Sequence, residues 1–320
     1  MCAVLAAAGF LVFCAGMAVG DYPIGLPGVV SALLGSGDAA DLLVVRELRL
    51  PRALVGLLAG VAFGVSGAVL QTVTRNPLAS PDMIGINAGA ATAVVAGIVL
   101  GFGPGVGTQV LGLAGGLTTA LVIYALAWKR GTTGYRIVLV GIGVAAVCTS
   151  TTDYLLTKAQ IFQAQQALGW LVGNLGGRGW EHVRPLALAT VVLVPAALAM
   201  SAWLRTLQLG DEVATGLGTP VQRARLALLL TSVGLVGFAT AAAGPILFVA
   251  LIAPQIAQRL AGLVRPPLIA SGLTGAVVVL TSDLAAREIT PAAQLPVGVV
   301  TGALGAPVFM WLLARRNRDA

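Results

Sequence analysis

Ten apolar stretches follow one another along the chain, and polar residues, charged residues, proline or glycine separate them. Their lengths lie close to the roughly 20 apolar residues that a helix needs to cross the hydrocarbon core of a bilayer. The pattern therefore predicts an all-α protein that crosses the membrane about ten times. The expected spans are residues 3–19, 53–70, 83–102, 110–128, 137–156, 185–204, 226–243, 246–260, 268–284 and 297–313.

The first stretch has the length of either a signal peptide or a spanning helix. It lacks a basic segment before the apolar run and a clear small-residue cleavage site after it. Both features are typical of secretory signals. We therefore expect a first membrane-spanning helix.

Composition places the whole chain in the membrane class. Hydrophobic residues make up 58% of the 320 residues and charged residues 10%, and the mean hydropathy is +0.94. A soluble domain carries a larger charged share. The sequence contains no polar linker, low-complexity tract or charged block, so we expect a single transmembrane domain over residues 1–320.

The basic residues give an orientation for the ten spans. The net charge is 19 − 12 = +7. With both termini in the cytoplasm, twelve Lys and Arg residues fall inside and seven outside, as the positive-inside rule requires. The charge therefore reports orientation and gives no reason to expect nucleic-acid binding. The seven outside residues are Arg46, Arg49, Arg52, Lys158, Arg178, Arg184 and Arg287.

Glycine recurs at a spacing of four within the second span, at Gly56, Gly60 and Gly64. Small residues at this spacing allow helix backbones to approach closely in a membrane, where lipid supplies no hydrophobic drive for association. We expect these glycines to serve close packing.

Few ionisable residues lie within the predicted spans. Asp153, Asp283 and Arg287 come nearest to doing so. Proton-coupled carriers usually place several such groups inside the membrane. The chain also lacks a phosphate-binding loop ending in Gly-Lys-Ser or Gly-Lys-Thr, and no Ser/His/Asp set stands out. These features argue against an ion-coupled carrier and against an enzyme.

Metal-ligating residues are scarce. The chain has one histidine, His182, and three cysteines, Cys2, Cys14 and Cys148, all inside apolar stretches. No pair has the spacing of a zinc site, and an odd number of cysteines at such positions argues against a disulfide framework. We expect no metal site and no cofactor in this chain.

Several motifs together resemble the FecCD-type permease family over nearly the whole chain. Residues 48–52 read LRLPR, Gln71 follows in the second span, and residues 75–86 read RNPLASPDMIGI. Further matches are WLVG at 170–173, GP at 244–245, FVALIAP at 248–254, SDLAAR at 282–287, LPVG at 295–298 and GAP at 305–307. Two positions depart from the family pattern. Gln255 stands where histidine is usual and Gln294 where glutamate often stands, which removes two titratable groups.

The resemblance implies the permease architecture of type II ATP-binding-cassette importers, with ten helices in each subunit. It further implies a pair of permease subunits, identical or different, and two cytoplasmic ATPase subunits that bind ATP and Mg²⁺. An extracytoplasmic substrate-binding protein completes the assembly. The substrate class is an iron(III)-siderophore complex, with haem or cobalamin as the alternative. ATP hydrolysis is expected in the partner subunits, and the expected location is the cytoplasmic (inner) membrane.

The resemblance also assigns roles to individual residues. Arg49, Arg52 and Arg287 match positions that contact the binding protein. Residues 207–225 look like the family's coupling helices, which fit a cleft on the ATPase. The candidate coupling residues are Leu209, Gly210, Ala214, Leu217 and Gly218. Five further residues form the family motif beside the translocation path, and these are Gln71, Asn76, Pro77, Pro81 and Gly85.

Overall fold

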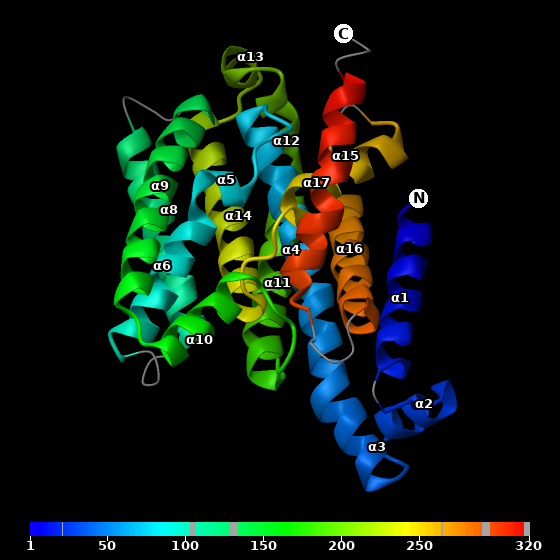
Figure 1. The fold of residues 1–320 in the computed structure, drawn as a ribbon. Helices are drawn as coiled ribbons and strands as arrows, with labels where there is room; N and C mark the ends of the chain where they lie inside the picture. Colours follow the sequence, from blue (N-terminus) through cyan, green and yellow to red (C-terminus); the bar gives the residue numbers. More distant parts are fainter. Residues whose placement is uncertain (21, 103–106, 129–133, 264, 290–294, 317–320) are drawn as a thin grey trace.

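A computed structural model describes residues 1–20, 22–102, 107–128, 134–263, 265–289 and 295–316, and the regular structure in these ranges is helical (Figure 1). The helices, in chain order, are α1 (Cys2–Ala18), α2 (Leu26–Leu34), α3 (Ala39–Leu43), the π-helix η1 (Val44–Arg49), α4 (Leu50–Thr74), α5 (Pro81–Ile84), α6 (Ile86–Val99), α8 (Thr108–Ala127), α9 (Gly134–Lys158), α10 (Ile161–Leu171), α11 (Trp180–Ala199), α12 (Ser201–Gln208), α13 (Asp211–Gly216), α14 (Val221–Ala243), α15 (Val249–Ala261), α16 (Leu268–Ile289) and α17 (Val297–Arg316).

Each of the ten predicted spans overlaps at least one helix of the described residues, which confirms the all-α fold. Six helical segments are long and apolar enough to cross a membrane alone. They contain α4, α8, α9, α11, α14 and α16. Three shorter apolar helices, of 10–17 residues, lie in α1, α6 and α17.

Three predicted spans differ from the observed helices. The span at 83–102 is divided, because Gly85 adopts φ +90° between α5 and α6. The span at 185–204 changes at Met200 from α11 to α12. The span at 246–260 begins too early, since α15 starts only after Phe248, whose φ is +66°. Apolar character alone did not reveal these breaks, because broken and continuous helices bury the same kinds of side chains.

The break before α15 leaves non-helical backbone inside the bundle. With 13 residues, α15 is about 20 Å long, shorter than the roughly 30 Å hydrocarbon core. The preceding Gly244, Pro245 and Ile246 are buried within the protein. Irregular backbone at membrane depth is tolerated only where protein covers its polar groups.

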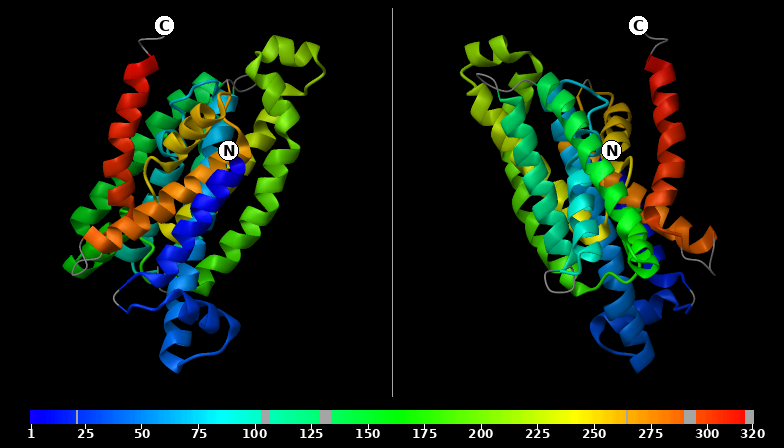
Figure 2. Two further views of the ribbon diagram at one scale, coloured as in Figure 1. Left: turned by 90° about the vertical axis from the view of Figure 1, so that its right-hand side faces the viewer. Right: turned by 60° about the vertical axis from the view of Figure 1, so that its left-hand side comes forward.

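Helix α4 runs through the centre of the bundle, with α14, α15 and α16 beside it (Figures 1 and 2). Its glycines lie against the backbone of these neighbours. A Cβ atom on Gly60 would lie 2.5 Å from the carbonyl oxygen of Gly275, and one on Gly64 would lie 2.1 Å from that of Ser271. The glycine stripe therefore packs α4 directly onto α16, as the sequence predicted.

A pair of serines adds a polar contact between α4 and α14. The Oγ atoms of Ser66 and Ser232 lie 2.6 Å apart, and both side chains are fully buried. Each hydroxyl is also within hydrogen-bond distance of the other residue's carbonyl oxygen. Such pairs satisfy buried hydroxyls and fix the register of two helices.

The bundle has two ends, which we call the α13 end and the α3 end. Helices α12 and α13 lie at the α13 end, and α2, α3 and α10 lie at the opposite, α3 end (Figure 1). Helix α1 begins toward the α13 end and runs to α2, whereas α17 ends at the α13 end. The first and last helices thus have their outer termini on the same side.

The α4–α16 contact predicts that adding one methyl group at Gly64 destabilises the protein. We expect Gly64→Ala to lower the free energy of unfolding by about 1–3 kcal/mol, because the new Cβ overlaps a backbone carbonyl that cannot turn away. The matched control is Gly143→Ala on α9, where nothing lies within 4 Å of the new Cβ. Thermal unfolding in detergent measures the difference, and equal melting temperatures for the two variants would contradict the packing role.

Candidate functional site

Arg49 is the last residue of η1, and its side chain turns inward at the α3 end. It is 8% exposed, and its Nη1 donates hydrogen bonds to the carbonyl oxygens of Met17 (2.8 Å) and Ala18 (3.1 Å). These carbonyls belong to the last turn of α1, where a cation is favourable because helix C-termini carry partial negative charge. Arg49 thereby ties the start of α4 to the end of α1.

Arg52 and Arg287 share one carboxylate. The Nη2 of Arg52 lies 2.8 Å from Oδ1 of Asp283, and Arg287, one turn further along α16, pairs with Oδ2. The Asp283 side chain is 4% exposed, and those of Arg52 and Arg287 are 13% and 12% exposed. The cluster carries one net positive charge because two guanidinium groups meet one carboxylate.

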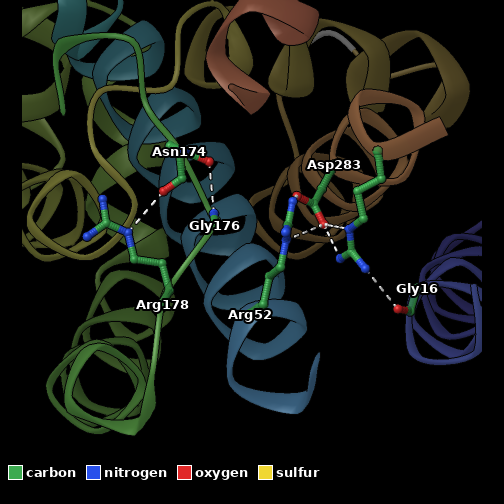
Figure 3. Close-up of polar contacts among 7 residues, drawn as sticks. Gly16, Arg52, Asn174, Gly176, Arg178 and Asp283 are labelled. Carbon is green, nitrogen blue, oxygen red and sulfur yellow. Dashed lines mark hydrogen bonds and ion pairs between the residues drawn. The ribbon is translucent and has the colours of Figure 1, made fainter. Parts of the chain in front are cut away.

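The same cluster reaches the end of α1. Arg287 donates from Nη1 to the carbonyl oxygen of Gly16, 3.1 Å away. Figure 3 shows Arg52 extending from α4 toward Asp283, with Gly16 beyond it on α1. The structure therefore brings all three predicted docking arginines to one region, around the last turn of α1.

A fourth arginine lies beside this region, on the loop between α10 and α11. Arg178 donates from Nε to the carbonyl oxygen of Asn174 (3.0 Å), and the Asn174 side chain accepts a hydrogen bond from the Gly176 amide (Figure 3). Arg178 also contacts Nε2 of His182 at 3.0 Å. The charge count places Arg178 outside but gives it no role, because the sequence does not reveal that it contacts the Asn174 carbonyl and the His182 ring.

The candidate coupling segment forms α12 and α13. Gly210 and Gly218 flank α13 with φ values of +107° and +81°, conformations that favour glycine. Leu209 and Leu217 are each 61% exposed, and Val213 between them is 49% exposed. Val213 and Leu217, four apart, lie on one face at α13, and Leu209 precedes this helix. We call these three exposed side chains the exposed apolar strip, and Val213 is not among the residues expected from the sequence.

Ala214 has a different position from the other candidate coupling residues. It is fully buried and belongs to the apolar core that includes Leu204 and Leu207. Its small side chain lets α13 lie close to α12. Ala214 therefore positions α13, and its surface is not open to another protein.

An acidic residue anchors α13 to two other helices. Asp211 pairs with Arg225 at 2.9 Å and with Arg75 at 3.1 Å. The Arg225 side chain is 1% exposed, so its charge is compensated inside the protein, whereas Arg75 and Asp211 are partly exposed. The segment that protrudes at the α13 end is thus attached to the start of α14 and to Arg75, the residue that follows α4.

The motif at 71–77 builds an amide network between α4 and α15. The Nε2 of Gln255 donates to Oε1 of Gln71 at 2.6 Å, and Gln71 donates to the carbonyl oxygen of Leu251 at 3.0 Å. The Gln255 amide also lies 3.4 Å from the carbonyl oxygen of Pro77. The side chain at position 255 is thus an amide that does not titrate and that hydrogen-bonds to Gln71. Gln294, the other departure from the family pattern, lies outside the described residues.

The rest of the motif shapes the turns on either side of α5. The Asn76 side chain accepts a hydrogen bond from the Leu78 backbone amide (3.0 Å), while the backbone N–H of Asn76 donates to the Gln71 carbonyl oxygen (3.1 Å). Pro81 begins α5, and Gly85 ends it against α9, where a Cβ would lie 3.1 Å from the carbonyl oxygen of Gly141. These residues serve local structure as the chain passes from α4 to α6.

A polar cavity of about 440 Å³ connects the motif with the coupling segment. Gln71, Arg75 and Pro77 line it from the motif, and Gln208 lines it from the last turn of α12. Gln255 and Arg259 of α15 close another side. The candidate motif residues and the coupling segment therefore meet around one space at the α13 end.

Three glycines from separate family motifs meet inside the bundle. A Cβ on Gly173 would lie 2.4 Å from the carbonyl oxygen of Pro245, and one on Gly244 would lie 2.9 Å from the Cα of Gly173. A Cβ on Gly298 would lie 1.8 Å from the carbonyl oxygen of Val172. This contact holds the non-helical backbone before α15.

Comparison with known proteins gives the family. Residues 8–315 match the FecCD transport family. The chain belongs to this family. The ferric enterobactin transport system permease protein FepG of Escherichia coli is 41% identical, over 91% of this chain and 88% of that protein. The iron(3+)-hydroxamate import system permease protein FhuG of Bacillus subtilis is 39% identical, over 90% and 88%.

Two further relatives extend the comparison. The Fe(3+) dicitrate transport system permease protein FecD of Escherichia coli is 39% identical, over 85% of both chains. A solved metal-chelate type ABC transporter in an inward-facing conformation is 24% identical and has a TM-score of 0.87, with 98% of each chain covered. The chain therefore has the fold of that permease, which confirms the architecture expected from the sequence.

Metal ligands do not gather in the described part of the chain. Among these residues, no three His, Cys, Asp or Glu side chains lie close enough together to hold a metal ion. The cysteines Cys2, Cys14 and Cys148 are unpaired thiols.

Proposed function

We propose that this chain is the transmembrane permease subunit of an ATP-binding-cassette importer that moves iron(III)-siderophore complexes across the cytoplasmic membrane. The observation that carries the proposal is the full-length similarity to permease proteins named for ferric enterobactin, iron(3+)-hydroxamate and Fe(3+) dicitrate. These names favour an iron chelate over haem or cobalamin as the substrate. The few charged residues along the spans support this over an ion-coupled carrier.

The proposal assigns the remaining parts of the importer to other chains. Residues 1–320 form one transmembrane domain, which pairs with a second permease subunit. Two ATPase subunits bind ATP and Mg²⁺ at the α13 end, and a substrate-binding protein docks at the α3 end. The lysine and arginine count supports this orientation, because the richer side coincides with the α13 end and both termini then lie in the cytoplasm.

The ion pairs suggest how movement at the ATPase reaches the transport path. Closure of the ATPase pair displaces α13, and Asp211 transmits the displacement to Arg75 at the end of α4. The Gln71–Gln255 contact links this end of α4 to α15. The permease pair then alternates between outward-open and inward-open states, each favoured by a different ATPase state.

Transport in proteoliposomes tests the function itself. We expect uptake of iron bound to a siderophore when the permease pair, the ATPase subunits, the binding protein and internal ATP are all present. A proton or sodium gradient without the ATPase should drive none. Haem and cobalamin serve as matched substrates, and faster uptake of either one than of the siderophores would overturn the substrate assignment.

Docking of the binding protein is proposed at the arginine region of the α3 end. Arg52 and Arg287 retain some exposed surface and an excess of positive charge, whereas Arg49 contributes by holding the last turn of α1 beneath them. Exposed charges of this kind mainly set the rate and orientation of association. The partner surface should therefore be acidic.

Charge reversal tests this docking region. For Arg287→Glu we expect the binding-protein concentration that half-maximally stimulates ATP hydrolysis to rise about tenfold, because attraction becomes repulsion. Arg184→Glu, an exposed arginine on α11 near the same end, is the matched control. Size-exclusion chromatography of the assembled complex checks folding, and an unchanged stimulation curve for Arg287→Glu would contradict the docking role.

Contact with the ATPase is proposed at the exposed apolar strip, Leu209, Val213 and Leu217. Large apolar side chains that protrude into water are costly unless a partner covers them. We expect Leu217→Ser to reduce co-purification of the ATPase, while Leu263→Ser, which alters a 48% exposed leucine after α15, leaves it intact. Cysteine crosslinks should form from Leu217→Cys to the ATPase. Crosslinks from positions 129 and 130 alone would refute the assignment.

A further inference from the structure

An apolar pocket lies at the surface of the bundle between α8 and α14. Its volume is about 280 Å³, and all thirteen residues that line it are apolar or aromatic. Leu117, Leu121 and Tyr124 line it from α8, and Leu226 and Leu230 line it from α14. The pocket shares no lining residue with the polar cavity, and its Leu226 directly follows Arg225, the partner of Asp211.

The pocket exists because α8 and α14 separate toward the α13 end. Nearer the α3 end, small residues let these helices approach: a Cβ on Gly112 would lie 3.7 Å from the Cα of Ala241, and one on Gly237 would lie 3.0 Å from the side chain of Leu113. Beyond these contacts, the surfaces that line the pocket carry mostly larger apolar side chains, among them Leu117, Leu121 and Leu230. Bulkier side chains hold the helices apart and leave space between them.

The mouth of the pocket faces outward from the bundle. Leu121 is 61% exposed, Leu230 is 50% exposed and Leu117 is 38% exposed, and these residues stand on both sides of the opening. A water molecule would bind weakly there, because a bound water needs two to four polar partners and the lining supplies almost none. In a bilayer, the apolar group available to fill the space is a lipid acyl chain.

The end of the pocket near α13 carries groups suited to a lipid headgroup. Arg223 precedes Leu226 and Leu230 by three and seven residues, so all three lie on one face of α14, and Arg223 is exposed. Trp128 directly follows α8, and its ring centroid lies 5.6 Å from that of Tyr124 in the last turn of this helix. Tryptophan and tyrosine favour the membrane interface, and arginine donates charge-assisted hydrogen bonds to phosphate.

We propose that this pocket binds one acyl chain of an anionic phospholipid, with the headgroup phosphate beside Arg223 and Trp128. The apolar lining favours the acyl chain, and Arg223 favours a headgroup with negative charge. With the α13 end in the cytoplasm, the lipid belongs to the inner leaflet. Such a lipid would fill the gap between α8 and α14 and hold their separation constant.

Native mass spectrometry of the full-length permease tests the proposal. The protein is extracted from nanodiscs that contain equal amounts of phosphatidylglycerol and phosphatidylcholine. We expect one retained phosphatidylglycerol per chain. Arg223→Ala should lower its retention about fivefold, and Leu121→Trp should abolish it by filling the mouth of the pocket.

Two control variants separate this site from general lipid contact. Leu188→Trp changes a 69% exposed leucine on α11, and Arg184→Ala removes an exposed arginine near the α3 end. Both should retain the lipid as the unmodified protein does. Equal retention of the two lipids, or equal retention by the pocket variants and the controls, would overturn the proposal. A disulfide-linked dimer of a Leu121→Cys variant that lacks the native cysteines would also overturn it, because a second permease chain would then cover the pocket.

Discussion

The close backbone contact between α4 and α16 is the constraint on which the rest of the structure depends. Gly60 and Gly64 face Gly275 and Ser271 at distances that leave no room for a Cβ atom. Lipid tails are as apolar as the side chains, so moving a side chain from lipid into a helix contact yields little hydrophobic free energy. Dispersion contacts and hydrogen bonds must therefore hold the helices together. Both the arginine region at the α3 end and the amide network at the α13 end take their geometry from α4.

The ten spans could be predicted because each is a long apolar run, and this signal depends on composition alone. The breaks at Gly85 and Phe248 could not, because the residues around them are as apolar as those within helices. The motif offered a partial signal, since Asn76, Pro77 and Pro81 favour turns. The glycine stripe likewise predicted close packing but gave no indication of which helix it faces.

The candidate sites were harder to predict than the spans, because their geometry depends on partners distant in sequence. Arg52 and Asp283 are 231 residues apart, and Asp211 finds both Arg75 and Arg225. Only the spacing of Asp283 and Arg287, four residues on one helix, could be read from the sequence. The sequence shows that Arg49 lies at the end of a span but not whether its side chain points inward or outward. Only the structure shows that it points inward, to the carbonyl oxygens of α1.

Helix α4 links the two candidate surfaces as a rigid element. Arg52 lies in its first turn and Arg75 caps its last, about 35 Å apart along the helix axis. Each of these arginines is paired with an aspartate on another helix, Asp283 on α16 and Asp211 on α13. Because α4 is packed along most of its length against α11, α14, α15 and α16, a displacement at one end is poorly absorbed by bending. In the proposed importer, a movement of α13 would therefore shift α4 together with α16 and reach the arginine region at the α3 end.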